Sequence, residues 1–319
     1  MEERALGNSG LFVSSVTLGT MTWGRDTDVY EARDQFNIYY NAGGRSLDTA
    51  DVYCDGTSEE IVGEFLREFP DVILATKAVA VPEPRKRDAS RRHLLNALDN
   101  SLRRLRRNHV DIWYLHAWDP LTPLEETLSV CQSVIASGKA RYIGISNYSG
   151  WQLATLATMA QNSIPLVAAQ MEYSLLERGI EREVVQASNA HGIGVTAWSP
   201  LGRGVLTGKY RNSTPADSRG ASQHFANFVA PYLTDNSRRI VEALAVASEG
   251  LGRPMLDTAL AWVLAQPQVA TAIVGARTAA QVRAIMAADI SVLPEGIHAA
   301  LSDVSAPQKS YPEFGWNQS

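Results

Sequence analysis

The stretch Ala140-Arg141-Tyr142-Ile143-Gly144-Ile145-Ser146-Asn147 is a short, mostly apolar run that ends in two polar residues. Seven other apolar runs end in a polar or glycine-rich cluster, at Thr20-Met21, Asp48-Thr49-Ala50, Lys77, His116, Gln170, Trp198-Ser199 and Gly275-Ala276-Arg277. Strand interiors that are apolar on both faces are typical of parallel sheets that helices cover. In a parallel barrel the active site lies at the carboxyl ends of the strands. The pattern therefore predicts a barrel with a functional site at one end.

Segments with helical spacing lie between these runs. We expect strands at 16–19, 45–48, 72–77, 111–116, 140–146, 166–170, 194–198 and 270–274. We expect helices near 28–42, 58–69, 90–107, 124–137, 150–161, 180–191 and 278–288, and a helix pair over 235–266 that breaks at Gly252-Arg253-Pro254. Alternating strands and helices predict βαβ units, and eight parallel strands close a barrel. The expected fold class is therefore α/β, a (β/α)8 TIM barrel.

Three segments fall outside this alternation. Residues 4–13 are expected to form a β-hairpin around a Gly- and Asn-containing turn, and this hairpin would plug the amino-terminal end of the barrel. The stretch 203–234 is rich in Ser, Asn, Gly and Pro and lacks periodicity, so it is expected to be a long loop over the active-site face. The aromatic C-terminal tail, residues 311–316, would either fold over the pocket or pack on the flank of the barrel.

The composition fits one barrel and argues against several kinds of partner. The 319 residues are 45% hydrophobic and contain no segment typical of an interdomain linker, so residues 1–319 are expected to form a single domain. A net charge of -5 gives no reason to expect nucleic acid as a partner, and the basic run 103–107 is expected to be a solvated helix face.

The spacing of Cys54 and Cys131 is typical neither of a disulfide framework nor of a zinc site. No signal peptide or bilayer-spanning stretch is found, so no membrane partner and a cytoplasmic location are expected, and the oligomeric state stays open.

Four residues near the ends of neighbouring strands form a candidate catalytic group, namely Asp48, Tyr53, Lys77 and His116. Singly, each has an ordinary structural explanation, such as a helix cap or a core side chain, but their shared end of the sheet favours catalysis. A phenol has a pKa of about 10, and a neighbouring ammonium lowers it. We therefore expect Lys77, held by Asp48, to make Tyr53 a usable proton donor. His116 would orient a substrate carbonyl or share the proton transfer.

The same residues limit the type of reaction. The sequence has no Gly-x-Ser-x-Gly elbow, no activated nucleophile and no metal-ligand set. A general acid without a nucleophile suits a reduction in which a cofactor supplies the hydride. A glycoside hydrolase that uses Asp48 with Asp51 or Glu59 as paired carboxylates is an alternative. That alternative leaves Lys77 and Ser146-Asn147 without a role.

Longer motifs resemble the signature of the aldo-keto reductase family. They are Asp48-Thr49-Ala50-Asp51-Val52-Tyr53 with Gly56-Thr57-Ser58-Glu59-Glu60, then Gly138-Lys139-Ala140-Arg141-Tyr142-Ile143-Gly144-Ile145-Ser146-Asn147-Tyr148, and Trp198-Ser199-Pro200-Leu201-Gly202-Arg203-Gly204. The resemblance extends to about residue 289 and is strongest to bacterial reductases near the potassium-channel β-subunits. It implies a barrel that binds NADP(H) without a Rossmann domain, and the start of the chain has no Gly-x-Gly-x-x-Gly. The implied activity is NADPH-dependent reduction of an aldehyde or ketone. The alternative is a nucleotide-binding regulatory subunit with little turnover.

The resemblance also implies a role for individual residues. Tyr53 would donate the proton, Lys77 and Asp48 would tune it, and His116 would position the carbonyl. The nicotinamide would be held by Ser146, Asn147 and Gln170, with Trp198 near its ring and Tyr173 as a further neighbour. The pyrophosphate would lie against Ser199, Pro200, Leu201, Gly202, Arg203, Gly204 and Lys209, and the predicted cofactor site also includes Gly19, Thr20, Met21, Gly275 and Gln281.

Arg277 decides the choice of cofactor in this interpretation. Its guanidinium suits an adenosine 2′-phosphate, which favours NADPH over NADH, and Thr278 would cap a helix whose start favours an anion. Ile285 departs from the family, which usually has an Asn there that contacts the adenine edge. Cys54 stands where the family often has Gly.

The substrate pocket is expected to have aromatic walls. Trp23, Trp118 and the 203–234 stretch would form these walls beside Tyr53 and His116. Aromatic walls suit apolar carbonyl compounds and also sugar rings.

Overall fold

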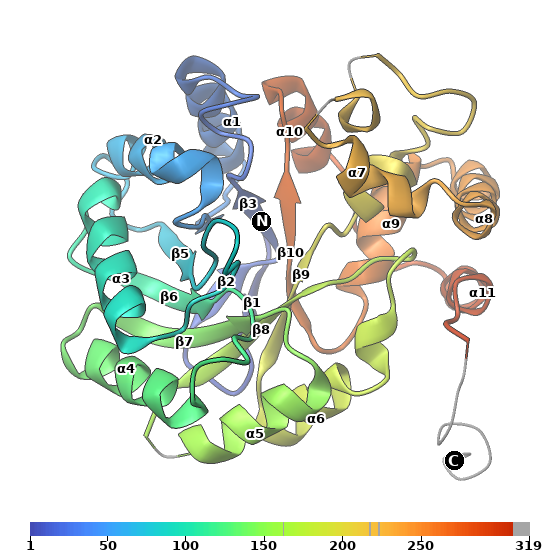
Figure 1. Cartoon of the computed structure of the whole chain (residues 1–319). Coiled ribbons are helices and arrows are strands. Elements are labelled where there is room, and N and C mark those ends of the chain that lie inside the picture. Colours follow the sequence, from blue (N-terminus) through green and yellow to red (C-terminus); the bar gives the residue numbers. More distant parts are fainter. Residues whose placement is uncertain (162, 217, 223, 309–319) are drawn as a thin grey trace, which may run out of the picture.

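Eight parallel strands close into a barrel in the computed structural model, which describes residues 1–161, 163–216, 218–222 and 224–308 (Figure 1). In chain order the strands are β3 (Val16–Gly19), β4 (Ser46–Asp48), β5 (Ile73–Ala78), β6 (Val110–Leu115), β7 (Ala140–Ser146), β8 (Leu166–Glu172), β9 (Gly194–Trp198) and β10 (Val269–Gly275). The barrel closes where β10 pairs with β3, and Gly275 lies opposite Gly19. The predicted (β/α)8 barrel is confirmed.

Helices surround the barrel and connect successive strands (Figure 1). They are α1 (Val29–Asn41), α2 (Thr57–Phe65), α3 (Arg91–Leu105), α4 (Leu124–Ala136), α5 (Gly150–Ala160), α6 (Val184–His191), α7 (Ala226–Val229), α8 (Asp235–Leu251), α9 (Met255–Leu264), α10 (Ala279–Met286) and α11 (Glu295–Val304). Several begin where the sequence supplies a cap, because Asp28, Ser90, Thr234 and Thr278 each accept a backbone N–H of the following first turn. The predicted break between α8 and α9 occurs at Gly252, which is left-handed.

The predicted hairpin plugs the amino-terminal end of the barrel. Strands β1 (Glu3–Ala5) and β2 (Phe12–Ser14) pair antiparallel. Leu6 and Val13 are buried in one cluster with side chains from the barrel strands, including Ile112. The turn lies against the chain at Gly192, because Asn8 donates to the Gly192 carbonyl at 2.7 Å. A Cβ on Gly7 would stand 2.4 Å from that same oxygen, so this close approach requires glycine.

Two segments differ from the predictions. The 203–234 stretch is not an irregular loop but carries α7 and the short 3-10 helices η3 (Gly202–Thr207), η4 (Arg219–Ala221) and η5 (Ala230–Tyr232). Elements of three to six residues are too short to show a helical period. Helix α11 was also not predicted, and it starts after Pro294, beyond the last of the motifs on which the predictions relied. The tail at 311–316 lies outside the described residues.

The basic run at the end of α3 is only partly solvated. Arg103 and Arg106 are exposed, as expected. Arg104 instead forms an ion pair with Glu59 of α2, and Arg107 donates to the carbonyls of Leu66 and Phe69. Half of this run therefore ties α3 to the α2 region. No helix in the described ranges is long and apolar enough to cross a membrane.

Candidate active site

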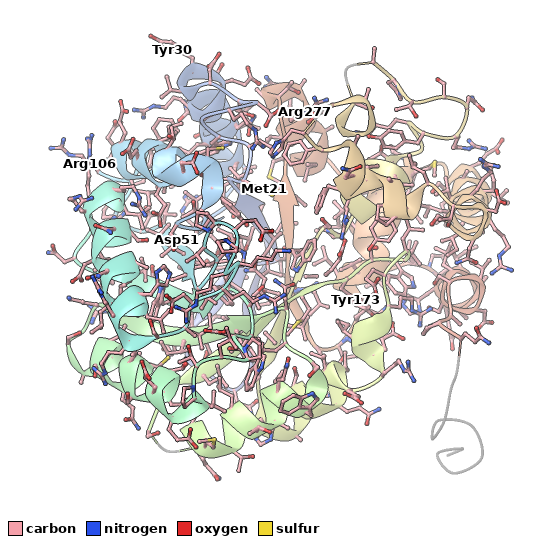
Figure 2. The ribbon with its side chains drawn as sticks, viewed as in Figure 1. Met21, Tyr30, Asp51, Arg106, Tyr173 and Arg277 are labelled. Carbon is pink, nitrogen blue, oxygen red and sulfur yellow. The ribbon has the colours of Figure 1, made fainter. Side chains whose placement is uncertain are left out.

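A cavity of about 520 Å³ opens at the carboxyl ends of the barrel strands. Many of the residues predicted for the site line it, namely Gly19, Thr20, Met21, Asp48, Tyr53, His116, Asn147, Gln170, Trp198, Ser199, Pro200, Leu201, Arg203, Gly204, Lys209, Gly275, Arg277 and Gln281. Figure 2 labels Met21 and Arg277, which lie on the loops that follow β3 and β10, the first and the last strand of the barrel in chain order. The cavity therefore collects residues from the whole length of the chain.

Lys77 connects Asp48 to Tyr53 at the bottom of this cavity. Its ammonium is fully buried and donates to Asp48 Oδ1 at 2.5 Å, to the Thr49 carbonyl at 2.7 Å and to the Tyr53 hydroxyl at 3.3 Å. An ammonium has three donors and no acceptor. The Tyr53 oxygen must therefore accept from Lys77, which leaves the hydroxyl hydrogen of Tyr53 available to another acceptor.

The electrostatics of this group differ in one respect from the prediction. Burial is the largest effect on Tyr53 and raises its pKa, while the Lys77 charge acts in the opposite direction without reversing it. The expected net lowering is therefore wrong. Burial alone would lower the pKa of Lys77, but the Asp48 carboxylate and the hydrogen bonds raise it above its ordinary value. The pair consists of a neutral phenol and a permanent ammonium.

The loop after β4 holds Tyr53 in a left-handed turn. Tyr53 begins the 3-10 helix η1 (Tyr53–Gly56), in which Cys54 and Asp55 have φ values of 50° and 54°. This backbone region costs about 1–2 kcal/mol for residues other than glycine. The preference of the family for Gly at the position of Cys54 has this physical basis. The Cys54 thiol contacts the Met21 carbonyl at 3.6 Å, which links the turn to the end of β3.

His116 is a neutral imidazole beside Tyr53. The two ring centroids lie 6.2 Å apart in an edge-to-face arrangement. Burial and the charge of Lys77 lower the pKa of His116 to about 3. Its Nδ1 atom is buried and has no hydrogen-bond partner within the described part of the chain. A neutral ring can donate a hydrogen bond to a carbonyl oxygen without adding a charge.

The amides predicted to hold a nicotinamide already have partners in the protein. Asn147 donates from Nδ2 to the His116 carbonyl and the Ser146 hydroxyl, both at 3.1 Å, and accepts from the Trp198 indole at 3.2 Å. Gln170 donates to Asp48 Oδ2 at 2.8 Å. Ser146 is buried and, unlike Asn147 and Gln170, is not among the cavity-lining residues. Ser146 therefore orients Asn147 instead of facing the cavity.

The charge of Arg203 is used within the protein. Its guanidinium pairs with both oxygens of Glu172, at 2.7 and 2.5 Å, and donates to the Phe228 carbonyl at 2.5 Å. It also lies 4.0 Å from the ring centroid of Phe228. Arg203 thus fixes the segment around α7 over the cavity, and although it lines the cavity as predicted, its charge is already paired with Glu172.

Two further cations line the cavity and suit a dinucleotide. Lys209 and Arg277 line the same cavity from the segments that follow β9 and β10, which are neighbouring strands of the barrel. The backbone at Gly204 has a φ of 93°, and a Cβ there would stand 3.1 Å from Lys209 Nζ. Thr22 donates to the Ala276 carbonyl at 2.9 Å and so holds the loop before Arg277. A glycine cradle with two cations is the donor set that bridged phosphates need.

Sequence reasoning missed five lining residues outside the predicted 203–234 wall, which are Thr22, Leu256, Ile273, Val274 and Ala284. The apolar residues Leu256, Ala284 and Ile285 line the same cavity as Arg277 and Gln281, and Ala284 and Ile285 follow Gln281 by about one turn of α10. The adenine ring of a dinucleotide would contact these apolar side chains by packing instead of by hydrogen bonds. Only the strand positions Ile273 and Val274 carried a sequence signal, because they precede the polar end of β10.

Of the walls predicted for the substrate pocket, the 203–234 stretch lines the cavity, for example through Thr207 and Phe228, whereas Trp23 and Trp118 do not. Trp23 is fully buried, donates to Gln35 at 3.0 Å and packs on Phe65. Trp118 packs edge-to-face on Tyr148 and Trp151, with ring centroids 5.4 Å apart in both pairs. Neither Trp23 nor Trp118 is among the residues that line the cavity. The aromatic wall is built by Trp198 and Phe228, whose rings are nearly parallel with centroids 6.4 Å apart.

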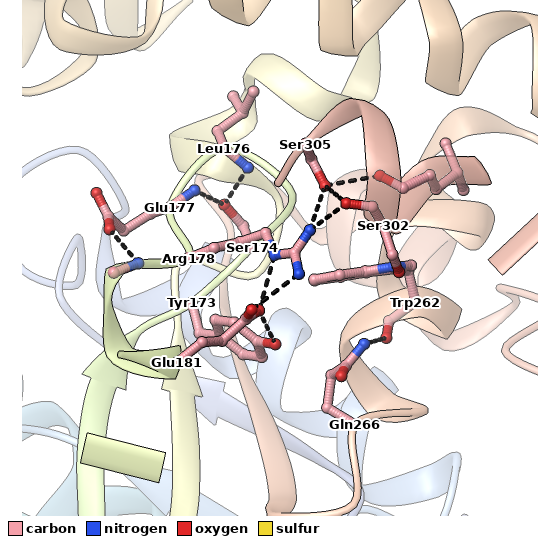
Figure 3. A network of polar contacts seen from close by, with 12 residues as sticks. Tyr173, Ser174, Leu176, Glu177, Arg178, Glu181, Trp262, Gln266, Ser302 and Ser305 are labelled. Carbon is pink, nitrogen blue, oxygen red and sulfur yellow. Dashed lines mark hydrogen bonds and ion pairs between the residues drawn. The ribbon is translucent and has the colours of Figure 1, made fainter. Parts of the chain in front are cut away.

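Tyr173, which was predicted to lie near the nicotinamide ring, points away from the cavity. Its hydroxyl donates to Glu181 at 2.7 Å, and Glu181 in turn pairs with Arg178 (Figure 3). Arg178 also donates to Ser302 and Ser305 at the end of α11. Tyr173 therefore belongs to a structural network on the flank of the barrel, and it does not line the cavity.

The arrangement of carboxylates contradicts the hydrolase alternative. Asp48 is bound by Lys77 and Gln170, whereas Glu59 is fully buried and bound by Thr76 and Arg104. Neither Asp51 nor Glu59 lines the cavity. A glycosidase needs two carboxyl groups that flank its substrate.

Comparison with known proteins identifies the family of this chain. The family model described as "Aldo/keto reductase family" matches residues 15–305, and the chain belongs to the aldo/keto reductase family. It is 36% identical over 305 residues to a probable voltage-gated potassium channel subunit beta of Arabidopsis thaliana, covering 92% of each chain. It is 35% identical to the uncharacterized oxidoreductase YrpG of Bacillus subtilis, covering 99% of this chain and all of the relative. It is 32% identical to the L-glyceraldehyde 3-phosphate reductase of Escherichia coli, covering 88% and 85% of the two chains. The protein is thus an oxidoreductase of a family that uses nicotinamide cofactors.

Proposed function

We propose that this protein, with residues 1–319 acting as one unit, reduces the carbonyl group of an aldehyde or ketone to an alcohol with NADPH. The observation that carries the proposal is the 3.3 Å contact between Lys77 Nζ and the Tyr53 hydroxyl at the bottom of the cavity. When bound, the reduced nicotinamide supplies the hydride. The protein supplies the proton and the orientation.

Tyr53 is the proton donor in this proposal. Its hydroxyl hydrogen is not needed by Lys77, so it can be donated to a carbonyl oxygen in the cavity. When the proton leaves, the phenolate that forms is stabilised by the buried ammonium of Lys77, which Asp48 keeps charged. His116 lies beside Tyr53 and fixes the carbonyl oxygen as a neutral donor.

Arg277 supports the choice of NADPH over NADH. It lines the cavity from the loop after β10, together with the apolar residues Leu256, Ala284 and Ile285. A guanidinium binds phosphate in a bidentate manner, and a charged hydrogen bond contributes about 1.5–3 kcal/mol. Arg277→Leu should therefore weaken NADPH binding about ten- to hundredfold and leave NADH binding nearly unchanged.

The test is a fluorescence titration with both nucleotides, followed by an aldehyde and ketone panel monitored by cofactor absorbance. Wild-type protein should bind NADPH more tightly than NADH and oxidise it only when a carbonyl compound is present. Equal affinity for the two nucleotides would refute the assignment of NADPH.

A second candidate is a regulatory subunit that binds nucleotide and turns over little, which the similarity to the Arabidopsis protein favours. Tyr53→Phe separates the two candidates. In an enzyme this change should lower turnover about 10²–10⁴-fold without weakening NADPH binding. If wild-type and Tyr53→Phe protein turn over equally slowly across the panel, the regulatory candidate is favoured.

A further inference from the structure

A carboxyl group with one buried oxygen precedes Tyr53 by two residues and has no part in the proposed reaction. Asp51, labelled in Figure 2, lies on the loop between β4 and α2, two residues before Tyr53. Its backbone N–H donates to the carbonyl of Lys77 at 3.1 Å. Its Oδ1 atom is buried and lacks a hydrogen-bond partner among the residues that the structure describes. Such a group in a protein interior needs an explanation.

The neighbours of Asp51 leave it without a bound cation. Glu59 of α2 acts on Asp51 through its negative charge. Arg104 of α3 could neutralise Asp51, but it forms an ion pair with Glu59 at 2.6 Å. The second oxygen of Glu59 accepts from Thr76 at 2.5 Å. The ammonium of Lys77 on β5 is bound to Asp48. Asp51 is therefore the third carboxyl group in a cluster with two cations.

This imbalance favours a proton on Asp51. Burial, followed by the negative charge of Glu59, raises the pKa of Asp51 to about 7, although Arg104 and Lys77 act in the opposite direction. The effect extends to Tyr53, because a charge on Asp51 raises the pKa of that phenol. Asp48 acts on Tyr53 in the same direction, and Lys77 opposes both.

We propose that Asp51 controls proton donation by Tyr53, which is fast while the Asp51 carboxyl group holds a proton and slow once that proton has left. The transferred proton moves from the Tyr53 oxygen to the carbonyl oxygen, and Asp51 only sets the charge beside it. Asp51 is thus a positioning residue that makes the acid strength of Tyr53 depend on pH near neutrality. This proposal rests on the proposed carbonyl reduction.

The experiment compares wild-type protein with Asp51→Asn, which keeps the shape of the protonated side chain. Asp55→Asn is the matched control, because Asp55 is exposed and lies two residues beyond Tyr53 in the same turn. At saturating NADPH and aldehyde, kcat of the wild type and of the control should fall about three- to tenfold between pH 6 and pH 8.5. In Asp51→Asn, kcat should change less than about twofold over this range, a difference that a merely structural role would not produce.

A second measurement does not depend on activity or on the variant folding. The carboxyl carbon of Asp51 and the ring Cζ of Tyr53, assigned through the backbone by triple-resonance NMR, should shift with one common midpoint near pH 7 in wild-type protein. An Asp51 midpoint near its ordinary value, or a Tyr53 signal that does not follow it, would overturn the proposal. An Asp51→Asn variant that keeps the wild-type pH profile would overturn it as well. If wild-type protein reduces no carbonyl compound, the proposed function fails, while the NMR titration still decides the role of Asp51.

Discussion

Gln170 donates a hydrogen bond from its side-chain nitrogen to Oδ2 of Asp48 at 2.8 Å, and the other oxygen of that carboxylate faces Lys77 at 2.5 Å. One buried carboxylate therefore joins the predicted nicotinamide side of the cavity to the group that holds Tyr53. A change in any of these side chains affects both stability and chemistry, because each leaves the others with unpaired charges or donors.

Replacing Lys77 with Met should lower the free energy of unfolding by about 3–5 kcal/mol, because Asp48 would remain buried without its cation. The double variant Lys77→Met with Asp48→Asn should recover part of this loss, although it should be as inactive as the single variant. Urea denaturation followed by circular dichroism measures both effects. A Lys77→Met protein as stable as the wild type would contradict the expectation.

The pH dependence of stability should reveal the buried state of His116. The folded protein does not protonate this ring until the pH falls to about 3, whereas the unfolded chain does so near 6.5. The unfolded state therefore binds more protons between these values, so stability falls as the pH drops from about 6.5 towards 3. His116→Gln should lack this contribution. Urea midpoints of the two proteins should diverge below pH 6.5, and parallel curves would disprove the assignment.

Breaking the pair between Glu172 and Arg203 should loosen the segment around α7. Glu172→Gln removes the charge that holds the Arg203 guanidinium, which in turn holds Phe228. We expect faster amide hydrogen exchange at 225–232 and a higher KM for the carbonyl compound, with a smaller effect on kcat. Glu181→Gln is the control, because it breaks an arginine pair with Arg178 in a separate network. Equal exchange rates at 225–232 in all three proteins would argue against this function of Arg203.

Two helical glycines should respond to alanine in opposite ways. A Cβ at Gly63 in α2 would stand 2.2 Å from the backbone oxygen of Arg104, so Gly63→Ala should cost about 1–3 kcal/mol by separating α2 from α3. Nothing lies within 4 Å of a Cβ at Gly250 in α8, so Gly250→Ala should stabilise by about 0.5–1 kcal/mol. Thermal unfolding of both variants should show shifts of opposite sign, and a Gly63→Ala protein with unchanged Tm would be inconsistent with the tight packing of the two helices.

The catalytic group could be predicted from the sequence because the geometry of a parallel barrel is strict. Residues at the carboxyl ends of successive strands must converge, so Asp48, Lys77, His116 and Gln170 come together once the strands are recognised. The contact of Tyr53 with Lys77 follows from the short loop after β4.

The loop residues could not be predicted because their orientation depends on distant partners. Trp23 comes four residues after the end of β3 at Gly19. Its backbone N–H donates to the Thr20 carbonyl in a tight turn, and its side chain is buried against Phe65. Arg203 forms an ion pair with Glu172, and no local sequence pattern indicates that these two residues are partners. The direction in which the pKa of Tyr53 shifts depends on how deeply its hydroxyl is buried, and the spacing of residues in the sequence does not reveal that depth.

The hairpin covers the amino-terminal end of the barrel, and the cavity opens at the other end, where the strands have their carboxyl ends. Met1 lies next to Gly43, just before strand β4 begins, and Arg4 is anchored to the carbonyl of Leu264 at 2.7 Å. A tether attached at Met1 would therefore project from the side opposite the entrance. The protein could be immobilised on a bead or an electrode through this end with its opening facing the solution, and reactants would still diffuse in and out without obstruction.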